Sequence, residues 1–141
     1  MVVTFFGHKD TPKSIETVLR ANLIDLIENY GATEFYVGNN GKFDVMVYRQ
    51  LEELSQIYPI TYSIVLAYLP VEKNKYFDFT NTIYPEGIET VPKRFAISRR
   101  NKWMIQRADV VVTYVTNNFG GSYQFKSIAE KEGKRIIELS E

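Results

Sequence analysis

Three glycine-rich turns carry the residue types best suited to chemistry. Each turn follows a short run of β-forming residues, and the turns are Gly7-His8, Gly38-Asn39-Asn40-Gly41 and Gly120-Gly121-Ser122. Glycine lets main-chain N–H groups approach an anion closely, and a helix that begins at such a turn adds the positive end of its dipole. Ser122 can offer a hydroxyl to a ligand, cap the helix that it opens, or do both. The turns therefore predict phosphate binding.

Two charged side chains extend this predicted site. Asp44 follows the Gly41 turn, in the first turn of a predicted helix, where a carboxylate either complements the helix dipole or orients a ribose hydroxyl. Arg100 can hold a phosphate through two parallel hydrogen bonds. Its neighbour Asn101 interrupts an apolar helical stripe, so its amide needs a partner, which is either the neighbouring glycine loop or a ligand.

His8 is the only histidine of the chain. A histidine that acts as a general base needs a nucleophile or an orienting partner within hydrogen-bond reach. The sequence places no serine or second histidine beside it, and the chain has no cysteine. We therefore favour a hydrogen-bonding role for His8 within its loop over catalysis.

The elements that position these turns alternate between strands and helices. The residue pattern predicts strands over residues 2–6, 34–37, 61–69, 109–116 and 134–139. Between them it predicts helices over residues 11–31, 43–57, 93–108 and 122–132; Thr11 is the expected cap of the first and Gly31 its stop. Residues 70–92 have no sustained period and are expected to form a functional or mobile loop.

This alternation predicts an α/β protein with a single Rossmann-like, three-layer domain over residues 1–141. We expect a mostly parallel sheet of about five strands, flanked by helices on both faces. The carboxyl ends of parallel strands meet at one edge of a sheet, and ligands bind outside that edge. The three glycine-rich turns should therefore lie close together.

Composition narrows the function classes. Lys plus Arg and Asp plus Glu number 17 each, so the chain lacks an overall positive field, and we do not expect nucleic acid as a partner. The absence of cysteine excludes disulfides and thiolate metal sites and favours a cytoplasmic location; we assign no metal site. No run approaches the ~20 apolar residues that span a bilayer, so no membrane partner is expected.

The chain resembles the SLOG superfamily, a Rossmann-like group that contains the DNA-processing protein DprA and the LOG phosphoribohydrolases. The resemblance rests on "SRRNKWMIQRADVVVTYV", the following "GGS" and "KSIAEKEGKRI", and "TFFGHKD" and "GNNGKFD" bring the chain closest to the YpsA-like branch. It implies a site for a nucleotide or a nucleotide-derived ligand. The implied ligand-binding residues are Gly7, His8, Gly38, Asn39, Gly41, Asp44, Arg100, Asn101, Gly120, Gly121 and Ser122.

Two positions depart from the pattern of these relatives. Lys9 stands where the YpsA-like branch usually has an arginine, and a lysine cannot make the same planar, two-point contact. Phe125 stands where the LOG enzymes have the glutamate that assists cleavage of the N-glycosidic bond. Phenylalanine cannot transfer a proton, so a LOG-like reaction would need another carboxylate, for which Asp44 is the best candidate and Glu130 a second one.

The sequence thus predicts binding of a small-molecule nucleotide, as the possible ligand of a sensor, with no other cofactor. Cleavage of a nucleotide at its glycosidic bond is the first alternative. Single-stranded DNA binding, by analogy with the DNA-processing relatives, is the second, and Arg99, Arg100 and Lys102 leave it open. A homo-oligomer formed through exposed helix faces is also open.

Overall fold

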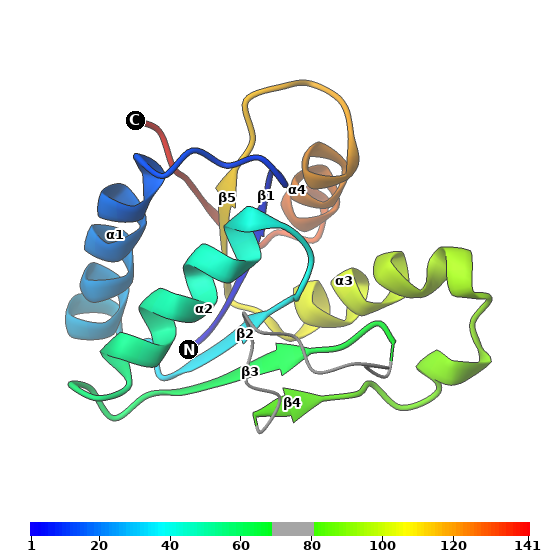
Figure 1. Cartoon of the computed structure of the whole chain (residues 1–141), viewed down its shortest axis with the longest axis horizontal. Helices are drawn as coiled ribbons and strands as arrows, with labels where there is room; N and C mark the ends of the chain where they lie inside the picture. Colours follow the sequence, from blue (N-terminus) through cyan, green and yellow to red (C-terminus); the bar gives the residue numbers. More distant parts are fainter. Residues whose placement is uncertain (69–80) are drawn as a thin grey trace.

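The computed structural model describes residues 1–68 and 81–141. A parallel sheet with strand order β4-β3-β2-β1-β5-β6 forms its centre (Figure 1). The strands are β1 (Val2–Gly7), β2 (Glu34–Val37), β3 (Thr61–Val65), β4 (Thr82–Ile83), β5 (Val110–Tyr114) and β6 (Arg135–Glu138). Every pair of neighbouring strands is parallel, which confirms the predicted fold class.

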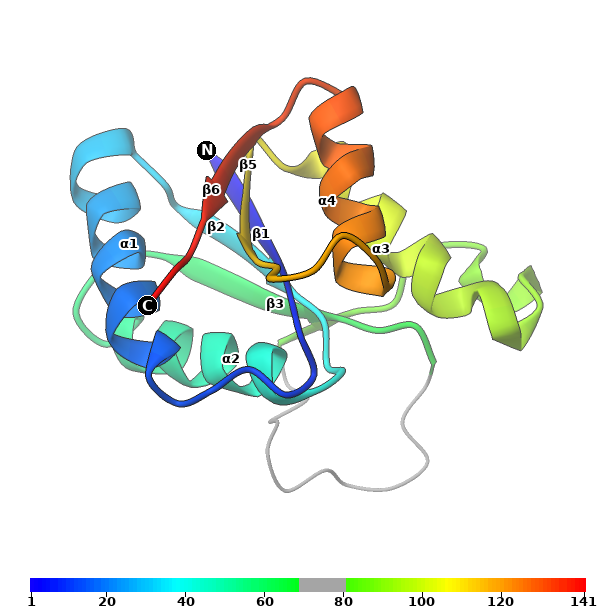
Figure 2. The ribbon, with the colours of Figure 1, turned by 90° about the horizontal axis from the view of Figure 1, so that it is seen from above.

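Helices cover both faces of the sheet. They are α1 (Ile15–Tyr30), α2 (Lys42–Leu54), α3 (Ala96–Arg107) and α4 (Gly121–Lys131), and two short 3₁₀ helices, η1 (Ile88–Thr90) and η2 (Lys93–Phe95), precede α3. Helices α1 and α2 pack on one face, and α3 and α4 pack on the other (Figures 1 and 2).

Alternation along β1 shows why the layers form. Phe5 belongs to the core under α1 and α2, whereas Phe6 belongs to the core under α3 and α4. Successive side chains of a strand point to opposite faces, so an uninterrupted apolar run fits a strand that is covered on both sides. The run that predicted β1 is therefore the cause of the three-layer arrangement.

One strand was not predicted. β4 lies within residues 70–92, where we expected only a loop, and it pairs with the end of β3 through Ile64 and Thr82. Two residues are too few to produce a periodic pattern, so no sequence signal marks this strand. The rest of the expected loop includes residues 69–80, which lie outside the described residues.

The start of α1 also differs from the prediction. The helix begins at Ile15, and its N-cap, Ser14, makes no side-chain capping bond. The hydroxyl of Thr11, the expected cap, donates instead to the carbonyl oxygen of His8 at 2.6 Å, which closes the loop after β1. The end of the helix is as predicted: Gly31 adopts the left-handed conformation, with φ of 72°.

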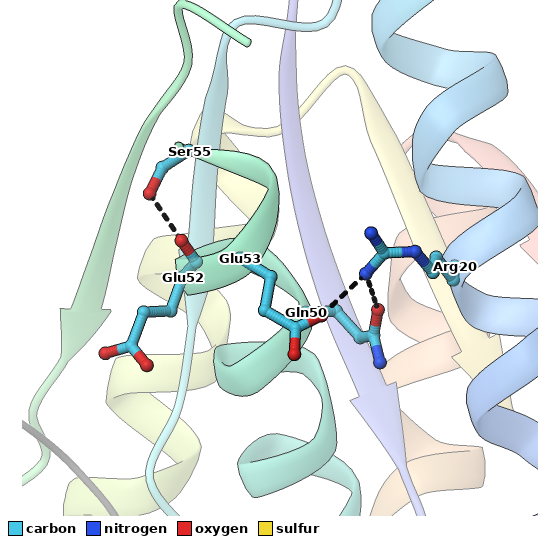
Figure 3. A network of polar contacts seen from close by, with 5 residues as sticks. All are labelled: Arg20, Gln50, Glu52, Glu53 and Ser55. Carbon is cyan, nitrogen blue, oxygen red and sulfur yellow. Dashed lines mark hydrogen bonds and ion pairs between the residues drawn. The ribbon is translucent and has the colours of Figure 1, made fainter. Parts of the chain in front are cut away.

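A polar network joins α1 to α2 on the outer surface (Figure 3). One guanidinium nitrogen of Arg20, Nη1, donates to Gln50 Oε1 and to Glu53 Oε2, both at 2.8 Å. Near the end of α2, the Ser55 hydroxyl donates to the Glu52 carbonyl at 2.7 Å. Exposed ion pairs contribute about 0–1 kcal/mol, so this network orients α2 more than it stabilises the fold.

The strand order places the site. β1 lies between β2 and β5, and the chain moves outward from β1 in both directions. In open parallel sheets this reversal leaves a crevice outside the carboxyl ends of the central strands, where ligands bind. The turns after β1, β2 and β5 all open toward this edge, as the sequence predicts.

Candidate functional site

A pocket of about 350 Å³ lies at the carboxyl edge of the sheet, and we call it the edge pocket. It is bounded by the end of β1, the turn between β2 and α2, and the helices α3 and α4. Among the predicted site residues, those that line it are Gly7, Gly38, Asp44, Arg100, Asn101, Gly121 and Ser122. The structure therefore brings most of the predicted residues into one cavity.

The amino end of α4 is open toward solvent. Its N-cap, Gly120, has φ of 91°, and no side chain caps the helix. A Cβ added at Gly121 would have no heavy atom of the protein within 4 Å. The main-chain N–H groups of a helix's first turn have no partner within the helix, and here the space beside the two glycines leaves them accessible to an anion.

Ser122 makes a contact that differs from both predicted roles, which were binding a ligand and capping α4. Its hydroxyl donates to the carbonyl oxygen of Gly7 at 2.8 Å, so it neither caps α4 nor offers that proton to a ligand. The bond fixes the start of α4 against the end of β1. The glycine turn is thus held in place by a contact between residues far apart in the sequence.

Arg100 is buried rather than extended into the pocket, with 2% of its surface exposed. Nη1 donates to the carbonyl oxygen of Val65 at 2.9 Å and to Asn39 Oδ1 at 3.3 Å. Nε donates to Asn101 Oδ1 at 2.6 Å, which gives the predicted anomalous amide its partner. Arg100 therefore joins α3 to the end of β3 and to the β2–α2 turn; a phosphate contact from it stays a prediction.

Asp44 is the acidic residue among those that line the edge pocket. Its Oδ2 accepts a hydrogen bond from the main-chain N–H of Asn40 at 2.8 Å. Burial raises the pKa of Asp44 to about 6, although the positive charge of Arg100 and the Asn40 hydrogen bond both act in the opposite direction. The carboxyl thus titrates close to neutral pH.

Gly38 separates these two charged groups. A Cβ added there would lie 2.9 Å from Arg100 Nη1 and 2.9 Å from Asp44 Oδ2. No larger residue fits without displacing one of them, so the requirement for glycine is steric, not conformational. Burial lowers the pKa of Arg100, and the carboxylate of Asp44 opposes that shift. The closeness of Asp44 and Arg100 therefore requires a glycine at position 38 in the β2–α2 turn.

Phe125 forms part of the apolar wall of the pocket. Its ring is buried and stacks on Phe6, with 5.7 Å between the ring centroids. At the position where the LOG enzymes have a glutamate, this chain therefore has a packed aromatic ring. The enzymatic alternative rests on Asp44 and stays a prediction.

The remaining predicted residues lie beside the edge pocket. Gly120 precedes α4, and Asn39 and Gly41 line a second cavity next to α2. His8 Nε2 accepts a hydrogen bond from the main-chain N–H of Thr116 at 2.8 Å, so it joins the loop after β1 to the loop after β5. This agrees with the loop role that the sequence favoured for His8.

Lys9 lines the edge pocket although it was not among the predicted ligand-binding residues. Its carbonyl oxygen accepts a hydrogen bond from the N–H of Lys42 at 3.0 Å. A Cβ at Gly41, where φ is 102°, would lie 2.9 Å from Lys9 Cα. Lys9 and Gly41 come together because β1 and β2 are neighbours in the sheet. From the sequence, this contact could be predicted only from the expectation that both turns lie at the same edge of the sheet.

Two further findings concern the described residues as a whole. No helix within residues 1–68 and 81–141 is long and apolar enough to cross a membrane. Over the same ranges, no cluster of three or more histidine, aspartate or glutamate side chains is placed to hold a metal ion.

The fold and the site define a Rossmann-like α/β protein with a pocket at the carboxyl ends of its parallel strands. Two solved structures share this fold, each 15% identical to the chain. DNA processing protein A from Helicobacter pylori has a TM-score of 0.63, with 98% of this chain and 64% of that chain covered. The same protein from Streptococcus pneumoniae has a TM-score of 0.71, with 96% and 49% covered.

The chain thus spans 64% of the length of one of these structures and 49% of the other. No protein-family model and no curated protein sequence matches it. At this identity the likeness shows the fold alone. Membership of the SLOG superfamily, and of its YpsA-like branch, stays a prediction.

The comparison corrects one expectation. The Helicobacter pylori structure is described by its single-stranded DNA binding mode, so our statement that nucleic acid is not an expected partner is wrong. The error was to infer a local property from the total charge. Electrostatic attraction for phosphates depends on where cations gather on the surface, and a neutral chain can concentrate them at one edge.

Proposed function

We propose that this chain binds single-stranded nucleic acid, with one phosphate of the strand seated at the amino end of α4. The observation that carries the proposal is the open space at Gly120 and Gly121, where first-turn N–H groups face the carboxyl edge of the sheet beside the edge pocket. A fold shared with DNA processing protein A supports it.

The charges near the pocket suit a phosphate. Lys9 lines the edge pocket, is exposed, and makes no ion pair with any residue in the described ranges. Phosphate contacts supply most of the sequence-independent affinity of proteins for nucleic acid. A cation and open helical amides at one place are therefore sufficient to begin such a contact.

The test is binding of a labelled oligothymidylate, about 20 nucleotides long, measured by fluorescence anisotropy. Gly121→Asp is the informative variant. A Cβ there meets no heavy atom within 4 Å, and an acidic residue in the first turn of a helix is favourable, so the variant should fold at least as well as the wild type. Its carboxylate occupies the anion position, so we expect affinity to fall by about tenfold or more.

The matched control is Gln56→Glu, which adds the same charge at an exposed position after the end of α2, away from the carboxyl edge. It should bind like the wild type. If Gly121→Asp and Gln56→Glu bind equally well, the amino end of α4 is not the phosphate site. If the wild-type chain binds no oligonucleotide even at low salt, the proposal fails altogether.

The second candidate is a free nucleotide held in the edge pocket. Its volume of about 350 Å³ falls within the range of roughly 300–1,000 Å³ typical of small-molecule sites. Phe6, Met104 and Phe125 give it an apolar wall suited to a base, and Asp44 adds a polar group. This candidate would be favoured if mononucleotides raise the melting temperature of the wild-type chain, Gly121→Asp removes that rise, and the wild type binds no oligonucleotide.

The glycosidase alternative uses the same pocket. A carboxyl group with a pKa of about 6 is suited to give or take a proton at neutral pH, and Asp44 is such a group. Release of free base from nucleotides, abolished by Asp44→Asn, tests it. The YpsA-like branch, the cytoplasmic location and homo-oligomer formation stay predictions.

A further inference from the structure

A second and larger cavity, of about 600 Å³, lies beside the edge pocket, against helices α1 and α2. It is lined by the loop after β1, the beginning of α1 and the first half of α2. We call it the basic groove. Its charged lining residues are Lys9, Asp10, Lys13, Glu16, Lys42 and Arg49.

The groove carries an excess of positive charge. Basic residues outnumber acidic ones in its lining, and Lys9, Lys13 and Lys42 are all exposed. In the described part of the chain none of these three lysines forms an ion pair. Cations that the protein does not neutralise itself are available to an anionic ligand.

Its rim is fixed by hydrogen bonds before any ligand arrives. The N–H of Lys42 donates to the Lys9 carbonyl at 3.0 Å, so the turn after β1 is attached to the beginning of α2. The N–H and the hydroxyl of Thr11 both donate to the His8 carbonyl, at 3.2 Å and 2.6 Å. A site that is already ordered loses less conformational entropy on binding than a flexible one.

The groove adjoins the edge pocket, because Lys9 lines both. Pro12, Val45 and Met46 add apolar surface between the cations. Alternating cationic and apolar surface fits a single strand, which presents phosphates at regular intervals along its sugars. A compact mononucleotide in the edge pocket would leave the groove empty, whereas a strand would not.

We propose that the basic groove binds phosphates of the same single strand whose first phosphate sits at α4, at the nucleotides that follow along the chain. This inference rests on the proposed function and adds the path of the strand. It assigns Lys13 and Lys42 to binding, neither of which lines the edge pocket.

The test compares oligothymidylates of increasing length, from a dinucleotide to about 12 nucleotides. The double variant Lys13→Glu/Lys42→Glu should bind the dinucleotide like the wild type, and the longest oligonucleotide about tenfold or more weakly at low salt. The slope of log affinity against log salt should also become shallower by about 1.4, because each lost phosphate contact on a single strand contributes about 0.7.

The control is Arg107→Glu/Arg135→Glu, which makes the same charge change at exposed positions at the end of α3 and the beginning of β6, away from the carboxyl edge. Equal losses in both double variants at all lengths would reduce the effect to net charge and overturn the inference. An unchanged salt slope in Lys13→Glu/Lys42→Glu would overturn it too, while leaving the proposed function intact. Failure of the wild type to bind any length refutes the proposed function itself, and the inference with it.

Discussion

Replacing Asp44 by asparagine should stabilise this protein at neutral pH. The change removes a buried carboxylate that lies near the Arg100 guanidinium, which at first suggests the loss of a favourable charge pair. The pKa of Asp44 indicates the opposite. It is raised from 3.8 to about 6 even with Arg100 nearby, so burial disfavours the charged form more than the guanidinium favours it.

The sign and the pH range follow from this shift. Below pH 3.8 the carboxyl is protonated in both the folded and the unfolded chain, and it contributes no penalty. Between there and about pH 6 the unfolded chain releases a proton that the folded chain retains, so stability falls as pH rises. Above that range the full penalty applies, at about 3 kcal/mol for a shift of about two pKa units.

Asparagine stays neutral at every pH and keeps an oxygen that can accept the Asn40 N–H. Urea denaturation should therefore give Asp44→Asn a free energy of unfolding about 3 kcal/mol above the wild type near pH 7.5, and a difference below about 0.5 kcal/mol near pH 3.5. Asp10→Asn, at an exposed site, is the control and should follow the wild-type profile. Destabilisation by Asp44→Asn near pH 7.5 would refute the reasoning, because the attraction to Arg100 would then exceed the cost of burial.

Three further substitutions, and one control at Gly121, test the packing around the pocket by the same denaturation assay. Gly38→Ala should lower the free energy of unfolding by about 1–3 kcal/mol, because the new Cβ would lie 2.9 Å from Arg100 Nη1. Gly121→Ala is the control and should stay within about 1 kcal/mol of the wild type. Equal effects of the two substitutions would contradict this account. Arg100→Ala should lower the free energy of unfolding by about 3–5 kcal/mol, because it leaves Asp44 buried without its opposite charge. A much smaller loss would indicate that Arg100 is not needed for stability and is available to bind a ligand. Phe125→Ala should lose about 3–5 kcal/mol, and a near-neutral result would mean that its ring is not part of the core.

Several predicted site residues lie together in the structure because they stand at strand ends. Gly7, Gly38 and Gly121 are far apart in the sequence, yet all line the edge pocket, because each lies at or beyond the carboxyl end of a parallel strand of one sheet. Arg100 is the instructive difference. Its position in a helix was predicted. However, the Val65 carbonyl that accepts a hydrogen bond from its guanidinium lies at the end of β3, and no local sequence pattern predicts such a partner.

The amino-acid sequence determined the layers of this protein. Apolar runs long enough to be buried on both faces, separated by helical periods, allow few arrangements other than a parallel sheet between helices. It also determined where the glycine-rich turns gather, because glycines at the ends of parallel strands reach the same edge. These are consequences of local pattern, which each segment carries by itself.

Only the tertiary structure decided which of those residues are available to a ligand. Ser122 binds the Gly7 carbonyl and Arg100 is enclosed, while Gly121 and Lys9 stay open. It also brought the loop after β1 against the beginning of α2 and so created the basic groove. A polar side chain finds its partners among groups that other elements bring near it, and those distances exist only once the chain has folded.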